Sequence, residues 1–135
     1  MVDASVALAW GFPDEGNEYA DAVLLNLERD TMLVPALFAV EVANALVVGE
    51  RRKRLRQADI RRFVALMEEL PIIQDVQPIG DMMSAALALA RELGLSAYDA
   101  AYLELAIRQG APLATLDNGL GTAARKAGVQ VYAQR

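Results

Sequence analysis

The feature that most constrains the fold is an alternation of short apolar segments with longer segments of helical periodicity. The short segments are typical of buried strands and lie at residues 1–3, 32–34, 72–76, 113–116 and 129–132. The longer segments lie at residues 4–10, 17–29, 36–50, 57–70, 81–93, 96–109 and 119–126. This alternation predicts an α/β layer protein with a mostly parallel sheet, in which functional side chains gather at the C-terminal ends of the strands.

Length and composition are those of one ordinary globular domain. The chain has 135 residues, of which 55% are hydrophobic and 23% are charged, so we expect a single domain over residues 1–135. No apolar run is long enough to span a membrane, and the N-terminus lacks the pattern of a secretory signal. We therefore expect a cytoplasmic protein with no membrane association.

The absence of both cysteine and histidine excludes several classes of enzyme site. Catalytic systems with a histidine base, cysteine nucleophiles and zinc sites made of imidazole or thiolate ligands all require one of these residues. Any catalysis must therefore depend on carboxylates, lysines, hydroxyls or a bound hard cation.

Two acids directly follow apolar segments. Asp3 follows Val2, and Asp117 follows the segment 113–116, with Thr115 two residues before it. An α/β sheet would place both carboxylates at its C-terminal edge. The alternative is that each caps the N-terminus of the next helix, a position at which aspartate is preferred.

Two further acids lie in the helical segments. Glu41 is flanked by apolar residues on both sides, and burying a lone carboxylate is costly unless a cation or hydrogen bonds compensate it. Alternatively, Glu41 and Asn44 form a narrow polar stripe that faces water. Asp99 follows Ser96 by three residues, so it can equally belong to a variant of the capping box.

Together, the four acids can converge at one edge of a parallel sheet. Carboxylates held close together repel one another unless cations bind between them, and ligand sets made only of oxygen favour Mg²⁺ or Mn²⁺. Such a cation can activate water and offset the charge of a phosphate, which makes phosphodiester hydrolysis the reaction that this pattern suggests.

At this point the sequence resembles a known family, the PIN-domain ribonucleases, and specifically the VapC-type toxins of bacterial toxin–antitoxin pairs. Four segments carry the resemblance: Val-Asp-Ala-Ser-Val-Ala-Leu-Ala-Trp at 2–10, Val-Glu-Val-Ala-Asn-Ala-Leu at 40–46, Ser-Ala-Tyr-Asp-Ala-Ala-Tyr-Leu-Glu-Leu-Ala at 96–106 and Ala-Thr-Leu-Asp-Asn-Gly-Leu at 114–120. They occur in the order and spacing of the family, over essentially the whole chain.

The resemblance implies a three-layer α/β/α PIN-like fold and a Mg²⁺- or Mn²⁺-dependent endoribonuclease that cleaves structured RNA. It makes Asp3, Glu41, Asp99 and Asp117 the catalytic and metal-binding carboxylates, with Ser5, Asn44 and Thr115 in support. It also implies a homodimer, and a VapB-type antitoxin that inhibits the toxin within a larger hetero-oligomer.

A basic segment interrupts an otherwise acidic chain. The net charge is −5, but residues 50–62 carry +5 and the remainder carries −10. We expect the cluster Arg51, Arg52, Lys53 and Arg54 to bind RNA, since phosphate backbones attract such groups. The same cluster can instead bind an acidic antitoxin surface or simply face solvent.

Large apolar and aromatic side chains are interpreted as packing residues. Ile60, Phe63, Val64 and Met67 form the expected buried stripe of the helix at 57–70. Trp10 and the tyrosines Tyr98, Tyr102 and Tyr132 are interpreted in the same way, rather than as platforms for stacking RNA bases.

Two other functions fit the acids less well. A receiver-like domain, in which clustered acids bind Mg²⁺ and one aspartate accepts a phosphoryl group, requires a nearby lysine. The chain has only Lys53 and Lys126, and neither follows a clear strand. A catalytically silent domain that binds metal and a partner remains open.

Overall fold

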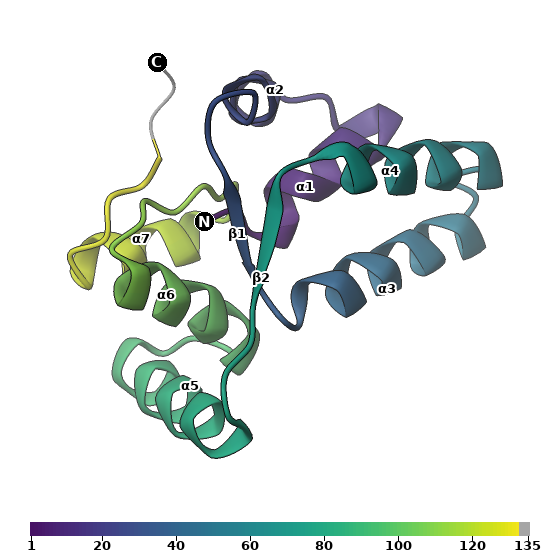
Figure 1. The fold of residues 1–135 in the computed structure, drawn as a ribbon. Coiled ribbons are helices and arrows are strands. Elements are labelled where there is room, and N and C mark those ends of the chain that lie inside the picture. Colours follow the sequence, from purple (N-terminus) through teal and green to yellow (C-terminus); the bar gives the residue numbers. More distant parts are fainter. Residues whose placement is uncertain (133–135) are drawn as a thin grey trace.

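The computed structural model describes residues 1–132 and shows a helix-rich α/β fold (Figure 1). In chain order the elements are α1 (Ala4–Gly11), the short 3₁₀ helix η1 (Pro13–Glu15), α2 (Glu18–Asn26), β1 (Met32–Pro35), α3 (Phe38–Arg51), α4 (Gln57–Glu69), β2 (Ile72–Asp75), α5 (Ile79–Leu93), α6 (Ala97–Gln109) and α7 (Asn118–Lys126). Among these residues, no helix is both long enough and apolar enough to cross a membrane.

The described strand segments pair in parallel, as the sequence predicts. Strand β1 pairs with β2 in the register Met32 to Ile72, and single parallel bridges join Val2 to Ala114 and Leu113 to Val131. The backbone N–H of Val2 also donates to the carbonyl of Leu33 at 3.3 Å. Residue 2 therefore lies between the segment at 113–114 and β1, at the centre of the layer.

Helices lie on both sides of this layer. Figure 1 shows α3 and α4 on one side of β1 and β2, and α5, α6 and α7 on the other. Helix α1 packs with the first group, in contact with α2, α3 and α4, whereas α6 packs against α5, α7 and β1. The α/β class and the mostly parallel sheet are thus as predicted.

Three of the expected strands are reduced to one or two bridged residues each. The segments at 1–3, 113–116 and 129–132 each pair over one or two residues only. Two of them end early because helix α1 begins at Ala4 and helix α7 at Asn118, which turns the backbone away from its neighbours. The pairing that remains is enough to fix where Asp3 and Asp117 lie.

Close packing around α1 uses two glycines. A Cβ atom on Gly11 would lie 2.7 Å from the ring of Phe63 on α4, and one on Gly49 of α3 would lie 2.8 Å from the ring of Phe12. These approaches hold the first helix against α3 and α4.

The predicted buried stripe of α4 is correct except at Val64. Phe63 is buried and Ile60 and Met67 are partly buried, but the prediction for Val64 is wrong, since 45% of its surface is exposed. Val64 faces an open apolar groove between α3 and α4.

Candidate active site

Asp3 lies at the centre of the site and is almost completely buried, with 4% of its surface exposed. One carboxylate oxygen, Oδ1, accepts hydrogen bonds from the hydroxyl of Ser5 at 2.6 Å and from the backbone N–H of Val6 at 3.2 Å. The other oxygen, Oδ2, accepts a short hydrogen bond from the hydroxyl of Thr115. Asp3 therefore caps α1, and it also receives two side-chain hydroxyls that a cap does not need.

The same two hydroxyls join Asp3 to the segment that carries Asp117. Ser5 Oγ accepts from the backbone N–H of Leu116 at 3.0 Å, and Thr115 Oγ1 accepts from that of Asp117 at 3.0 Å. The Asp117 carboxylate caps α7, since Oδ1 accepts from the backbone N–H of Leu120 at 2.8 Å. Each hydroxyl thus holds the loop before α7 in register with Asp3.

Asp99 lies in the first turn of α6 and is partly buried. The hydroxyl of Ser96 accepts from the backbone N–H of Asp99 at 3.1 Å, so Ser96 is the cap. Within residues 1–132, the carboxylate of Asp99 accepts no hydrogen bond in return, as a capping box would require. The hydroxyl of Ser96 nonetheless lowers the pKa of Asp99, against the larger effect of burial.

Glu41 lies in the first turn of α3 and is also partly buried. Its Oε2 atom is inaccessible to solvent and has no hydrogen-bond partner among the described residues. Asn44, one turn later, is exposed. The solvent-facing stripe accounts for Asn44 but not for Glu41, one of whose carboxylate oxygens is buried.

Electrostatics indicate that the four carboxylates face a common region. Burial raises the pKa of Asp3 despite its three hydrogen bonds, and the charge of Asp117 raises it further. Burial also raises the pKa of Glu41, with smaller contributions from the charges of Asp99 and Asp3. The pKa of Asp99 is raised by burial, then by Asp117 and Asp3.

The donor atoms in this region suit a hard divalent cation. All are carboxylate or hydroxyl oxygens, and the buried Oε2 of Glu41 lacks a hydrogen-bond partner in the described part of the chain. Among residues 1–132, however, no three acidic side chains are already arranged as a ready-made metal cluster. The residues therefore fit a cation by chemistry, and small side-chain rotations would have to bring the carboxylates together.

Comparison with known proteins assigns the family. A family described as the PIN domain matches residues 1–126. The chain belongs to the PIN domain family. A curated relative, Ribonuclease VapC3 from Pyrobaculum aerophilum, is 34% identical over 120 residues, which cover 89% of this chain and 90% of the relative.

A solved structure supports the same conclusion about the fold. The crystal structure of PAE2754 from Pyrobaculum aerophilum matches this PIN domain with a TM-score of 0.68 and 27% identity. The match covers 96% of this chain and 81% of that one. The family resemblance and the fold class predicted from the sequence are thereby confirmed.

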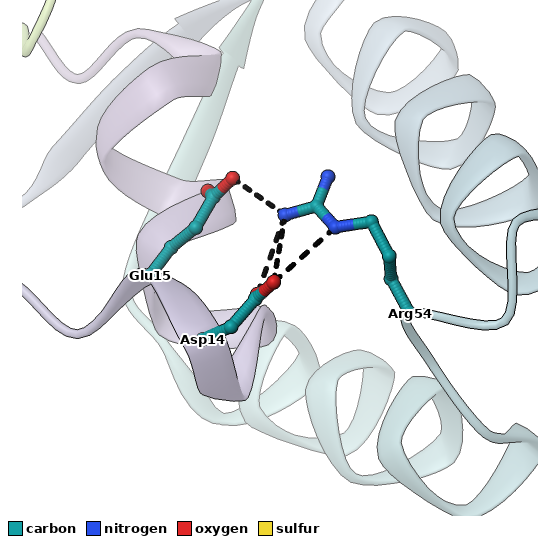
Figure 2. A network of polar contacts seen from close by, with 3 residues as sticks. All are labelled: Asp14, Glu15 and Arg54. Atoms are coloured by element: carbon teal, nitrogen blue, oxygen red, sulfur yellow. Dashed lines mark hydrogen bonds and ion pairs between the residues drawn. The ribbon is translucent and has the colours of Figure 1, made fainter.

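The basic cluster of this PIN domain lies at the turn between α3 and α4, and its four members are not equivalent. Figure 2 shows the guanidinium of Arg54 between two acids of η1; it lies 2.8 Å from Glu15 and 3.3 Å from Asp14. The same group lies 4.5 Å from the centre of the Phe12 ring. Arg51, Arg52 and Lys53 are exposed and form no ion pair within residues 1–132. Arg54 thus has a structural role that its neighbours lack.

The tyrosines of the PIN domain also differ from one another. Tyr98 is 67% exposed, so its interpretation as a packing residue was wrong. Tyr102 is 1% exposed and does pack in the core, but its hydroxyl has no hydrogen-bond partner in the described part of the chain. The sequence carried one signal for Tyr102, its position one helical turn after Asp99, which places both side chains on one face of α6.

Proposed function

We propose that this PIN domain is a VapC-type toxin, a Mg²⁺- or Mn²⁺-dependent endoribonuclease that hydrolyses phosphodiester bonds in structured RNA. The observation that carries the proposal is a buried, hydroxyl-bonded Asp3 whose surroundings also include the charges of Glu41, Asp99 and Asp117. The name of the relative Ribonuclease VapC3 supports the nuclease activity. In this proposal Asp3, Glu41, Asp99 and Asp117 hold the cation.

The chain's own residues then have distinct tasks. Ser5 and Thr115 fix the orientation of Asp3 through their hydroxyls, while the helix caps fix Asp3 and Asp117 relative to α1 and α7. A bound divalent cation would lower the pKa of a water molecule and offset charge on the scissile phosphate. A carboxylate beside the bound cation is suited to accept the proton of the attacking water.

The experiment is an RNA cleavage assay with Mg²⁺ or Mn²⁺ on the wild type and on Asp3→Asn and Asp99→Asn. We expect each substitution to lower the rate by at least about a hundredfold, the range typical of lost acid–base or charge-stabilising groups. Asp21→Asn is the matched control, because Asp21 is an exposed acid in the first turn of α2. Unchanged cleavage in the two site variants would leave the silent, partner-binding domain as the better explanation.

We further propose a VapB-type antitoxin as the protein partner and a homodimer as the unit that binds it. The name of the relative supports the antitoxin. Co-expression with the neighbouring reading frame should yield a stable complex that no longer cleaves RNA. A neighbouring product that neither co-purifies with the PIN domain nor inhibits it would contradict this part of the proposal.

A further inference from the structure

The hydroxyl of Tyr102 is a buried polar group without a hydrogen-bond partner among the described residues. The side chain is 1% exposed, and although the hydroxyl lies near the backbone of Ala4, it forms no hydrogen bond within residues 1–132. Buried hydroxyls of tyrosine are nearly always hydrogen-bonded, because an unpaired one loses its interaction with water and gains nothing. A phenylalanine would fill the same space without this cost.

The position of Tyr102 connects this hydroxyl with the acids. Tyr102 lies one helical turn after Asp99 on α6, and Ala4 is the neighbour of Asp3 in the chain. After burial, the largest influences that raise the pKa of Tyr102 are the negative charges of Glu41, Asp3 and Asp99, in that order. At neutral pH the phenol is therefore protonated, and it lies among carboxylates as a hydrogen-bond donor.

Glu41 provides the complementary group. Its Oε2 atom is the buried carboxylate oxygen that lacks a donor, and Glu41 exerts the largest of the three charge effects on Tyr102. Among residues 1–132, α6 thus carries a buried donor without an acceptor, and α3 carries a buried acceptor without a donor. Rotation about the side-chain torsions of Glu41 is the motion that would pair them.

We propose that Tyr102 is a positioning residue, whose hydroxyl donates a hydrogen bond to the Glu41 carboxylate and fixes it in the orientation that binds a divalent cation. The inference rests on the proposed function, since it assumes a cation site at the four acids. It predicts that the hydroxyl contributes to cation affinity, whereas a residue that only packs contributes its ring alone.

The test is calorimetric titration of the chelator-treated protein with Mn²⁺ alone. The Tyr102→Phe variant loses one hydrogen bond to a charged group. Its affinity for Mn²⁺ should therefore be about tenfold lower than that of the wild type. Tyr98→Phe is the matched control, because it removes the same hydroxyl from the same helix at an exposed position, and it should bind Mn²⁺ as the wild type does.

A second pair of variants identifies the acceptor. In a Glu41→Ala background the hydroxyl has no carboxylate to bind, so adding Tyr102→Phe should cause no further loss of Mn²⁺ affinity. In cleavage assays, the deficit of Tyr102→Phe should shrink as the Mn²⁺ concentration rises, because the cation site is weakened and not abolished.

The outcomes separate this inference from the proposed function. If wild type and Tyr102→Phe bind Mn²⁺ equally well, Tyr102 only packs and the inference is wrong, while the cation site stands. The inference would also be overturned if Tyr102→Phe still weakened Mn²⁺ binding about tenfold in the Glu41→Ala background. The hydroxyl would then act on a group other than Glu41. If the wild type itself binds no Mn²⁺ and cleaves no RNA, the proposed function fails and the inference fails with it.

Discussion

At the scale of single residues, Asp3 combines two roles that the sequence presents as alternatives. Its carboxylate caps α1 through Val6, and it also accepts the hydroxyls of Ser5 and Thr115. A capping aspartate is usually solvated, whereas only 4% of the surface of Asp3 is exposed. The cap fixes the backbone, and the hydroxyls fix the direction of the carboxylate, so the structural role prepares the side chain for the proposed catalytic one.

Asp3→Asn should therefore destabilise the metal-free protein by about 1–2 kcal/mol, even though it removes a negative charge from an acidic region. An asparagine amide group donates where the carboxylate oxygen accepts, so one of the two hydroxyls would lose its acceptor. Asp117→Asn is the matched control. Its carboxylate accepts only from the backbone of Leu120 among the described residues, and asparagine caps helices as well as aspartate does. Urea unfolding in the presence of a chelator measures the free energy of unfolding of both variants. If Asp3→Asn is more stable than the wild type, the hydrogen-bond argument is wrong.

Glu41 should behave in the opposite way, because its buried oxygen accepts no hydrogen bond within residues 1–132, whereas Asp3 accepts three that asparagine would disturb. The pKa of Glu41 is raised in the folded protein, so between the unfolded pKa of about 4.3 and the raised folded value the native state binds more protons than the unfolded state. Glu41 therefore lowers the free energy of unfolding as the pH rises through this window. Without metal, Glu41→Gln should become more stable than the wild type by about 1 kcal/mol at neutral pH, and by much less near pH 4. If the stability difference between Glu41→Gln and the wild type stays constant from pH 4 to pH 7, the charge of Glu41 does not destabilise the folded protein.

At the scale of elements, the turn between α3 and α4 divides the basic cluster into two kinds of residue. Arg54 is bound to Asp14 and Glu15 and stacks on Phe12, which ties this turn to η1 (Figure 2). Arg51 and Arg52 remain exposed at the end of α3. RNA binding is thus expected to depend mainly on Arg51 and Arg52, which form no ion pair within residues 1–132.

The double substitution Arg51→Ala, Arg52→Ala should weaken RNA binding and flatten its dependence on salt, with the slope of log K against log salt falling by about 1–2 for two lost phosphate contacts. Arg54→Ala is the control on the same turn. It should leave most of the salt dependence in place but lower the thermal unfolding midpoint, because it breaks the contacts with η1. A salt slope that is unchanged in the double variant would assign this surface to the antitoxin or to solvent.

The elements themselves could largely be predicted, because their signals are local. Ser96 caps α6, and Gly94 and Gly110 end α5 and α6 in the left-handed conformation, with φ of 65° and 61°. Contacts between distant segments could not be predicted in this way. The guanidinium of Arg108 on α6 binds both Glu104 of its own helix and Asp75 at the end of β2, and nothing in the periodicity of either segment indicates the second partner.

At the scale of the whole molecule, the placement of residue 2 between β1 and the segment at 113–114 explains why Asp3 and Asp117 lie near one another. This central position brings Asp3 beside Thr115, although 112 positions separate Asp3 from Thr115 in the sequence. It also brings Asp3 close to the start of α7. The sequence could place Asp3 and Asp117 after strands, but the neighbours of each strand follow from the packing of the entire chain. For the same reason the buried oxygen of Glu41 and the hydroxyl of Tyr102 were recognisable only in the structure.

Helix α5 carries the feature of the whole molecule that bears on the proposed homodimer. Ile79, Met83 and Leu87 follow one another at helical spacing and are 79%, 59% and 46% exposed. A row of exposed apolar side chains is unfavourable in water and is typical of a surface that a second protein covers. If the homodimer uses this row, Leu87→Glu should shift the protein from dimer to monomer in light scattering after size-exclusion chromatography. Leu25→Glu is the matched control, since Leu25 is an exposed leucine on α2, and it should leave the dimer intact. A dimer that survives Leu87→Glu but not Leu25→Glu would move the interface from α5 to α2.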